Sequence, residues 1–437
     1  MARDFSVPVQ GGDSSDMREK WSENSIQNNC KAIGSGKGRE RMANLELLRC
    51  VAMMMVVVLH YLGKGGLLTD LTQETLGSVG TAAWLLESFC IVAVNVYMFI
   101  SGYFLCMSSF KPSRLIQLWL QVWVYSVTIG LLGALTGVLT ETPFDMHYLL
   151  TLFLPILMGH YWFMTSYVFM YLFLPFVGMA AGRMTKQQMR IALGFLLFAF
   201  CVLKSVLPLR LEMDEQGYNC LWYMCVFLTA AYVRRFVLPG SEETAGRKEL
   251  TKGFSLKKRG CCLGMYVGGC LLIFAGTMIL RIVYLRTGSL GRMLGMCLEY
   301  NHLLPFLAAV GLFGVFYSLR IKGKAADIIY KAAPYTLGVY LLHENLGLRY
   351  TWQKWFRAEQ MVSLVSTSEN GNGAFGAVAG LFLWTAIAVI CVFVCGILAD
   401  IVREWIFRIL HQVLSCFRPY DRLVSIVKKA DAAFKRD

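Results

Sequence analysis

Apolar runs long enough to cross a bilayer recur along nearly the whole chain. A helix needs about 20 consecutive apolar residues to span the hydrocarbon. Hydrophobic residues make up 56% of the sequence and charged residues only 16%, whereas soluble domains are about a quarter charged. About ten runs approach the required length, at 44–61, 82–105, 115–139, 161–181, 190–209, 218–237, 261–285, 302–319, 332–349 and 377–402. The sequence therefore predicts an all-α, polytopic membrane protein with about ten transmembrane helices.

The run at 332–349 is the weakest of these, because Pro334, His343, Glu344 and Asn345 interrupt it. A shorter apolar stretch at 147–158 is too short to span and is typical of an interfacial or re-entrant helix. We predict the run at 332–349 as a span and the stretch at 147–158 as a non-spanning segment.

Positive charge is distributed unevenly between the predicted loops. With the N-terminus inside, the inner segments hold 32 Lys and Arg residues and the outer segments hold 7. Lys and Arg accumulate in cytoplasmic loops, so this asymmetry predicts that both termini are cytoplasmic. It also accounts for the net charge of +14 without a nucleic-acid partner, which we exclude.

Three segments follow from composition. Residues 1–43 are polar, which predicts a disordered cytoplasmic segment. Residues 44–410 form the predicted transmembrane domain, and 411–437 form a basic cytoplasmic tail. The cysteines lack paired zinc spacing and no metal site is implied. A disulfide between Cys220 and Cys297, both near the predicted outer face, stays an open alternative.

The first run carries polar residues along one face. Arg49 and His60 are eleven positions apart, which is about three helical turns plus 20°, and Glu46 lies one turn before Arg49. A charge inside hydrocarbon costs about 2.5–3.5 kcal/mol, so such residues commonly mark a functional path. The alternative is that Glu46 and Arg49 lie at the interface and extend into water.

This helix resembles the first helix of acyltransferase family 3, integral-membrane acyltransferases that modify cell-surface glycans. The family signature is an arginine, ten intervening residues and a histidine, which Arg49 and His60 match. The end of the second run, residues 99–103 (FISGY), is similar to the end of helix two in that family. The ending of the 332–349 run at His343 is similar to that of members from Gram-positive bacteria.

The resemblance implies an enzyme that transfers acyl groups other than aminoacyl groups. It would move an acyl group, with acetyl as the first candidate, from cytoplasmic acyl-CoA to a hydroxyl of a surface polysaccharide or lipid-linked glycan precursor. His60 would be the general base, and Arg49 would act in the path of the acyl donor. Lys111 and Arg114 would contact the CoA phosphates, although the positive-inside rule alone also explains them.

Four residues near the predicted outer face are candidates for binding the acceptor. These are Glu87, Trp162, His343 and Glu344. Glu87 would alternatively be an interfacial carboxylate in water, and Trp162 an ordinary interfacial aromatic. His343 and Glu344 belong to a polar triplet that cannot all face lipid.

The expected partners are membrane lipid, acyl-CoA and the glycan acceptor, in a multi-pass protein of the bacterial plasma membrane. One rival is a transporter or exporter of a glycan or small solute without covalent chemistry, in which Glu46, Arg49, His60 and Glu87 line a path. Another is a membrane domain that senses a small molecule.

The charge asymmetry predicts that residues 239–260 are cytoplasmic and residues 361–376 external. In a background cleared of reactive thiols, Ser255→Cys should therefore resist an impermeant thiol reagent in whole cells. A cysteine within 361–376 should react with the same reagent. External labelling of Ser255→Cys would contradict the orientation.

Overall fold

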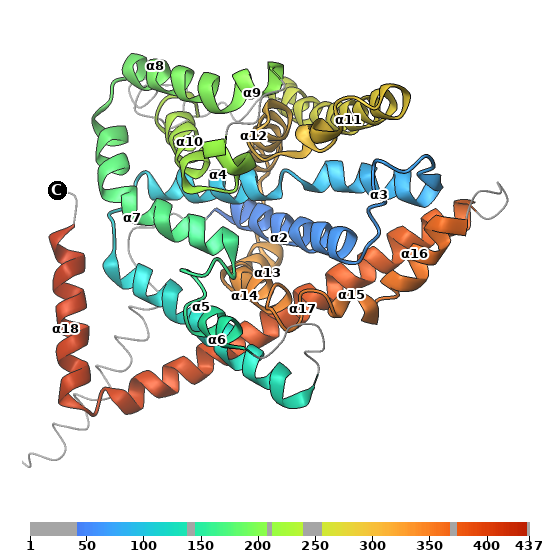
Figure 1. Cartoon of the computed structure of the whole chain (residues 1–437). Coiled ribbons are helices and arrows are strands. Elements are labelled where there is room, and N and C mark those ends of the chain that lie inside the picture. The colour runs from blue at the N-terminus through green and yellow to red at the C-terminus, as the bar shows by residue number, and fades with distance from the viewer. Residues whose placement is uncertain (1–41, 138–144, 208–211, 239–255, 368–373, 435–437) are drawn as a thin grey trace, which may run out of the picture. The chain divides into compact units, whose positions relative to one another are not determined.

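The structure is a computed structural model that describes residues 42–137, 145–207, 212–238, 256–367 and 374–434. Every regular element in these residues is a helix, with no strand among them (Figure 1). Nine helical segments of the described chain are long and apolar enough to cross a membrane. The predicted all-α, polytopic membrane fold is thereby confirmed.

Several of the nine segments contain a break or a local change of helix type. Ile91 and Val92 form a turn that divides the second segment into two helices. Residues 198–202 and 233–237 are π-helical. The segments are built from α2 (Ala43–Lys64), α3 (Gly77–Cys90) with α4 (Ala93–Leu105), α5 (Pro112–Thr136), α7 (Trp162–Arg183), α8 (Lys186–Leu197) with α9 (Leu203–Val206), α10 (Cys220–Tyr232), α11 (Leu256–Thr287), α12 (Leu303–Tyr317) and α17 (Ala374–Leu414).

The sequence prediction of a span at 332–349 is wrong, because these residues do not form one continuous helix. The chain forms α13 (Lys324–Ala332), a 3-10 turn at Ala333–Tyr335 and α14 (Thr336–His343). Pro334 lies in the turn, where its missing amide interrupts the hydrogen-bond ladder. After His343 the chain continues in turns, so the polar triplet 343–345 lies at the end of a short helix. The stretch near 147–158 likewise forms only a short helix, α6 (Met146–Phe153).

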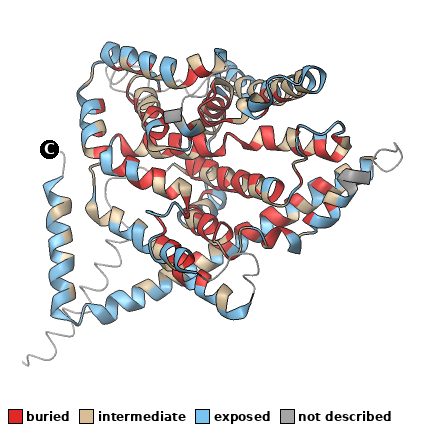
Figure 2. Cartoon of the chain, in the orientation of Figure 1, coloured by how far each residue is buried: buried red, intermediate tan, exposed pale blue. Residues whose placement is uncertain are grey.

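Helix α2 lies at the centre of the described helices. It packs against α3, α4, α12, α14 and α17, and Figure 2 shows the buried residues concentrated on it and its neighbours. Leu45, Leu48, Val57 and Leu62 are fully buried along its length. The residues that follow its polar face are therefore held inside the protein.

Helices α14 and α17 approach closely through two glycines. A methyl group on Gly396 would lie 2.5 Å from the Cα of Val339, and one on Gly338 would lie 2.4 Å from the Cβ of Asp400. Small residues permit this approach between membrane helices. The contact fixes the position of α14, whose last residue is His343.

The region expected to be a basic tail is largely helical. Helix α17 continues to Leu414, and α18 (Arg418–Ala433) follows it. The Asp431 carboxylate accepts hydrogen bonds from the Ser113 amide at 2.9 Å and from its hydroxyl at 2.5 Å. These contacts hold α18 against the start of α5. Cys220 and Cys297 are both free thiols, so the possible disulfide is absent.

Replacing Gly396 by alanine should destabilise the protein, because the added methyl group overlaps the α14 backbone. The expected net loss is about 1–2 kcal/mol after the gain in helix propensity, measured as a lower unfolding temperature in detergent. Gly268→Ala on α11 is the matched control, since no atom outside its own helix lies within 4 Å of its new methyl group. Equal stability of both variants would contradict the close contact.

Candidate functional site

A cavity of about 390 Å³ lies between α2, α3, α4, α7 and α14. Four residues that the sequence singled out line it: His60, Glu87, Trp162 and Glu344. They come from four different segments of the chain. The fold therefore brings candidates that are up to 284 positions apart in the sequence to one cavity.

The cavity has a polar end and an apolar end. His60, Lys64, Glu344 and Arg349 line the polar end, near the end of α2. Towards the start of α2 the walls are apolar side chains, namely Met53, Val56, Ile91, Val94 and Leu337. Such a cavity, apolar with few polar groups gathered at one place, is typical of small-molecule sites.

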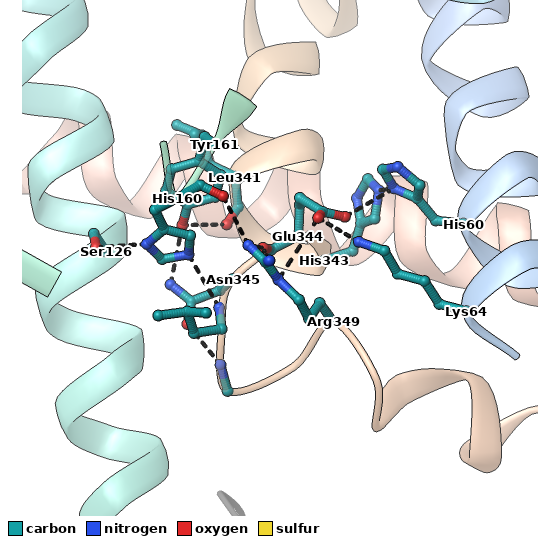
Figure 3. Close-up of polar contacts among 12 residues, drawn as sticks. His60, Lys64, Ser126, His160, Tyr161, Leu341, His343, Glu344, Asn345 and Arg349 are labelled. Atoms are coloured by element: carbon teal, nitrogen blue, oxygen red, sulfur yellow. Dashed lines mark hydrogen bonds and ion pairs between the residues drawn. The ribbon is translucent and has the colours of Figure 1, made fainter. Parts of the chain in front are cut away.

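His60 is the central polar residue of the site. Its Nδ1 lies 2.9 Å from Nε2 of His343 and 3.1 Å from Oε2 of Glu344. Figure 3 shows the two imidazoles and the carboxylate converging from α2 and α14. Both partners meet the same nitrogen of His60, which leaves its Nε2 outside this contact.

The proton positions on these two histidines follow from a backbone carbonyl. Nδ1 of His343 lies 2.6 Å from the carbonyl oxygen of Val339, and because a carbonyl only accepts, this nitrogen carries a proton. Nε2 of a neutral His343 is then an acceptor. Nδ1 of His60 therefore donates to it, so Nε2 of a neutral His60 is unprotonated. We assign these tautomers from the hydrogen-bond partners.

The Glu344 carboxylate is buried and held by two cations. Its side chain is only 4% exposed. Lys64 contacts one oxygen directly, and Nε of Arg349 lies 3.6 Å from that oxygen. The Arg349 guanidinium also donates to the carbonyl oxygens of Glu344 at 3.0 Å and of His160 at 2.8 Å. Burying a carboxylate requires such pairing, and Figure 3 shows the cluster.

A hydrogen bond to His160 holds the segment that follows α14 in place. Its Nε2 accepts a hydrogen bond from the Leu346 amide at 3.1 Å, so its Nδ1 donates to the Ser126 hydroxyl at 3.1 Å. His160 precedes the span that begins at Trp162, and burial followed by the charge of Arg349 lowers its pKa to about 3. Its ring stacks on Tyr161 at 4.0 Å, and the Tyr161 hydroxyl accepts from the Asn345 amide at 3.0 Å. The neutral imidazole thus has a structural partner on every side.

The ligand atoms of His60, His343 and Glu344 all lie within 4.8 Å of one another, a spacing that a metal ion would also fit. However, Lys64 and Arg349 contact the same carboxylate. Their positive charges oppose a cation at this place, and a direct contact between Nδ1 of His60 and Nε2 of His343 already joins the two imidazoles. We interpret the cluster as a hydrogen-bonded network.

Three predicted site residues lie away from both the cavity wall and the cluster around His60. Arg49 forms an ion pair with Glu46, with Nη1 at 2.7 Å from Oε2, about 16 Å along α2 from His60. Lys111 and Arg114 lie at the start of α5, where the Arg114 guanidinium sits 5.9 Å from the Tyr171 ring centroid. The structure does not bring these residues together with His60 in one pocket.

Sequence reasoning missed Lys64, Arg349, Tyr218 and Tyr300, all of which line the cavity. Lys64 carried a usable signal, because it follows His60 by one helical turn on the same face. Arg349 follows the polar triplet closely, but it is one of seven Lys and Arg residues in the predicted outer segments and nothing else in the sequence singles it out. The two tyrosines lie near turns and carried no periodic signal.

Comparison with known proteins gives a match to a protein-family model. A family model for acyltransferase family 3, described as an acyltransferase domain, matches residues 42–400. No curated protein and no solved structure matches the chain.

Proposed function

The chain belongs to acyltransferase family 3 and is an integral-membrane acyltransferase, and from this premise we propose that His60 is the general base for acyl transfer from acyl-CoA to a hydroxyl. The observation that carries the proposal is the bonding of His60. Nδ1 of His60 donates to His343 and lies 3.1 Å from the Glu344 carboxylate, whereas Nε2 is unprotonated, and His60 lines the cavity.

The proposed reaction begins with deprotonation of the acceptor. Nε2 of His60 takes the hydroxyl proton as the acceptor oxygen attacks the thioester carbonyl. A carbon–oxygen bond forms, the carbon–sulfur bond breaks, and the departing CoA sulfur takes the proton from His60. The imidazolium present between these steps is stabilised by Glu344, whose carboxylate lies 3.1 Å from Nδ1. Water is not consumed, and the products are an ester and free CoA.

His343 and Glu344 take a different role from the acceptor binding first expected of them. Their atoms contact Nδ1 of His60, so we assign them as positioning residues that orient the imidazole and fix its tautomer. Lys64 and Arg349 in turn hold Glu344. Other enzymes also use a neighbouring side chain to orient a catalytic base and to hold it in its productive tautomer.

The donor is proposed to enter from the end of the bundle where α2 begins. Arg49, Met53, Val56 and His60 follow one stripe of α2, and the last three line the cavity. The apolar stretch suits an acyl chain and the thin pantetheine arm. Arg49 near one end, with Lys111 and Arg114 at the start of α5, supplies cations for the CoA phosphates. Acetyl is the first candidate for the acyl group.

The proposed acceptor is a hydroxyl of a cell-surface polysaccharide or of a lipid-linked glycan precursor, and the proposed location is the bacterial plasma membrane. Family membership supports an enzyme over the transporter alternative. Labelled acetyl-CoA supplied to membranes, followed by mass spectrometry of the surface glycan with and without the protein, tests both the acyl group and the acceptor.

His60→Ala should lower the turnover number by about 10²–10⁴-fold, the contribution expected of a positioned general base. Transfer from labelled acetyl-CoA by purified protein measures it. The unfolding temperature in detergent should stay near that of the wild type. His147→Ala, at an exposed position on α6, is the matched histidine control.

His60→Gln separates catalysis from structure, because glutamine retains a hydrogen-bonding group but is no base. The same loss in turnover is expected for this variant. Wild-type turnover by His60→Gln would end the assignment and direct attention to His343. His343→Ala should lower turnover less than His60→Ala does, since it only misorients the base.

Lys111→Ala and Arg114→Ala should each weaken use of the donor without loss of folding. Removing one charge-assisted phosphate contact should raise the KM for acyl-CoA by about 5- to 150-fold. Steady-state kinetics with varied acyl-CoA provides the measurement. An unchanged donor KM in both variants would leave these residues with only a role in membrane orientation.

A further inference from the structure

Glu87 is a buried carboxylate whose bonding within the protein is incomplete. It is 9% exposed, it lines the cavity, and its Oε2 has no hydrogen-bond partner among the described residues. Leaving a buried polar atom without a hydrogen-bond partner is costly. Glu87 is therefore a group that a ligand in the cavity would complete.

Three aromatic rings line the same cavity as Glu87. The centroids of Trp162 and Tyr218 are 4.4 Å apart, those of Tyr218 and Tyr300 are 4.8 Å apart, and those of Trp162 and Tyr300 are 5.7 Å apart. All three rings contribute to the cavity wall. We call Glu87, Trp162, Tyr218 and Tyr300 the aromatic subsite.

Buried polar contacts hold these rings in place. The Tyr300 carbonyl accepts from the Asn95 amide at 2.7 Å, and the Tyr300 amide donates to the Gln216 carbonyl at 3.1 Å. The Tyr218 carbonyl accepts from the Ser166 hydroxyl at 2.6 Å. The two turns that carry the tyrosines are thereby joined to each other and to the helices, so a ligand would meet a preorganised surface.

The chemistry of the aromatic subsite limits the ligand that fits it. Flat apolar rings favour a ligand with a flat apolar face, and the unpartnered carboxyl oxygen of Glu87 favours a ligand with polar hydrogen-bonding groups. A sugar ring combines both, with a C–H face and a rim of hydroxyl or amine groups. An amine would also be attracted to the aromatic faces as a cation.

The position of the aromatic subsite agrees with the binding of an acceptor beside the base. Helices α2 and α3 run in opposite directions, and both His60 and Glu87 line the one cavity. The apolar stretch from Met53 to Val56 lies on the other side of His60 along α2. Donor and acceptor would thus approach the imidazole from different parts of the cavity.

We propose that Glu87, Trp162, Tyr218 and Tyr300 bind a saccharide ring of the acceptor, with Glu87 accepting a hydrogen bond from a ring hydroxyl or amine. The inference rests on the proposed function, because it names the residues that would hold the acceptor proposed for the same cavity. It assigns Glu87 and Trp162 to one binding surface and adds the two tyrosines to it.

Sugar binding to the full chain in detergent, measured by calorimetry without acyl-CoA, tests the aromatic subsite apart from the chemistry. The probes are cellobiose, the chitosan disaccharide, which carries amines on the same kind of ring, and sorbitol, an open-chain polyol. Trp162→Leu and Glu87→Ala should each weaken disaccharide binding by about tenfold or more. Trp119→Leu, at an exposed position on α5, and Glu74→Gln, at an exposed loop position, are the matched controls.

Glu87→Gln distinguishes the two donor groups. If Glu87→Gln still binds cellobiose, the ligand group that donates to residue 87 is a hydroxyl. If the variant no longer binds the chitosan disaccharide more tightly than cellobiose, that group is an amine. Either result supports the aromatic subsite. Tyr300→Phe, which retains the ring, serves if Trp162→Leu does not fold and should weaken binding less than Glu87→Ala.

Three results would overturn the inference: no binding of either disaccharide, equal affinity in the wild type and the subsite variants, or equal affinity for sorbitol. Acetyl transfer is measured on the same preparations. Transfer without a disaccharide effect would refute the aromatic subsite alone, whereas disaccharide binding without transfer from acetyl-CoA would refute the proposed function alone.

Discussion

The site depends on keeping one carboxylate ionised inside a membrane protein. Glu344 is almost completely buried, and Lys64 and Arg349 contact it from two directions. Breaking such a buried pair by removing one partner costs about 3–5 kcal/mol. The same carboxylate meets Nδ1 of His60. The ion pairs that make the buried charge tolerable therefore also join the end of α2 to the segment after α14, at the polar end of the cavity.

Much of the fold could be predicted because a membrane simplifies the problem. Apolar runs of sufficient length indicated the spans, and nine segments of the described chain have that character. The run at 332–349 misled, since Pro334 and the polar triplet divide a stretch whose composition is otherwise apolar. Its short helix is held instead by the close contact of Gly338 and Gly396 with their neighbours, a tertiary feature that hydropathy does not report.

The candidate site could be predicted in part. The spacing of Arg49 and His60 placed both on one face of a helix. In the structure His60 lines the cavity, and Arg49 lies about 16 Å away along α2. The partners of His60 could not be deduced, because they come from residues more than 280 positions away. The same holds for Tyr218 and Tyr300, which reach the cavity through turns that buried hydrogen bonds hold together.

The contact between His343 and Val339 has a consequence for how this site would be studied. The acceptor that sets the proton order is a main-chain carbonyl near the end of α14, so exchanging the side chain at 339 leaves it in place. Alanine scanning would therefore not detect the role of this carbonyl. The proton order is set by the backbone of α14 itself, and only a change in backbone path or an ester in place of a peptide bond would alter it.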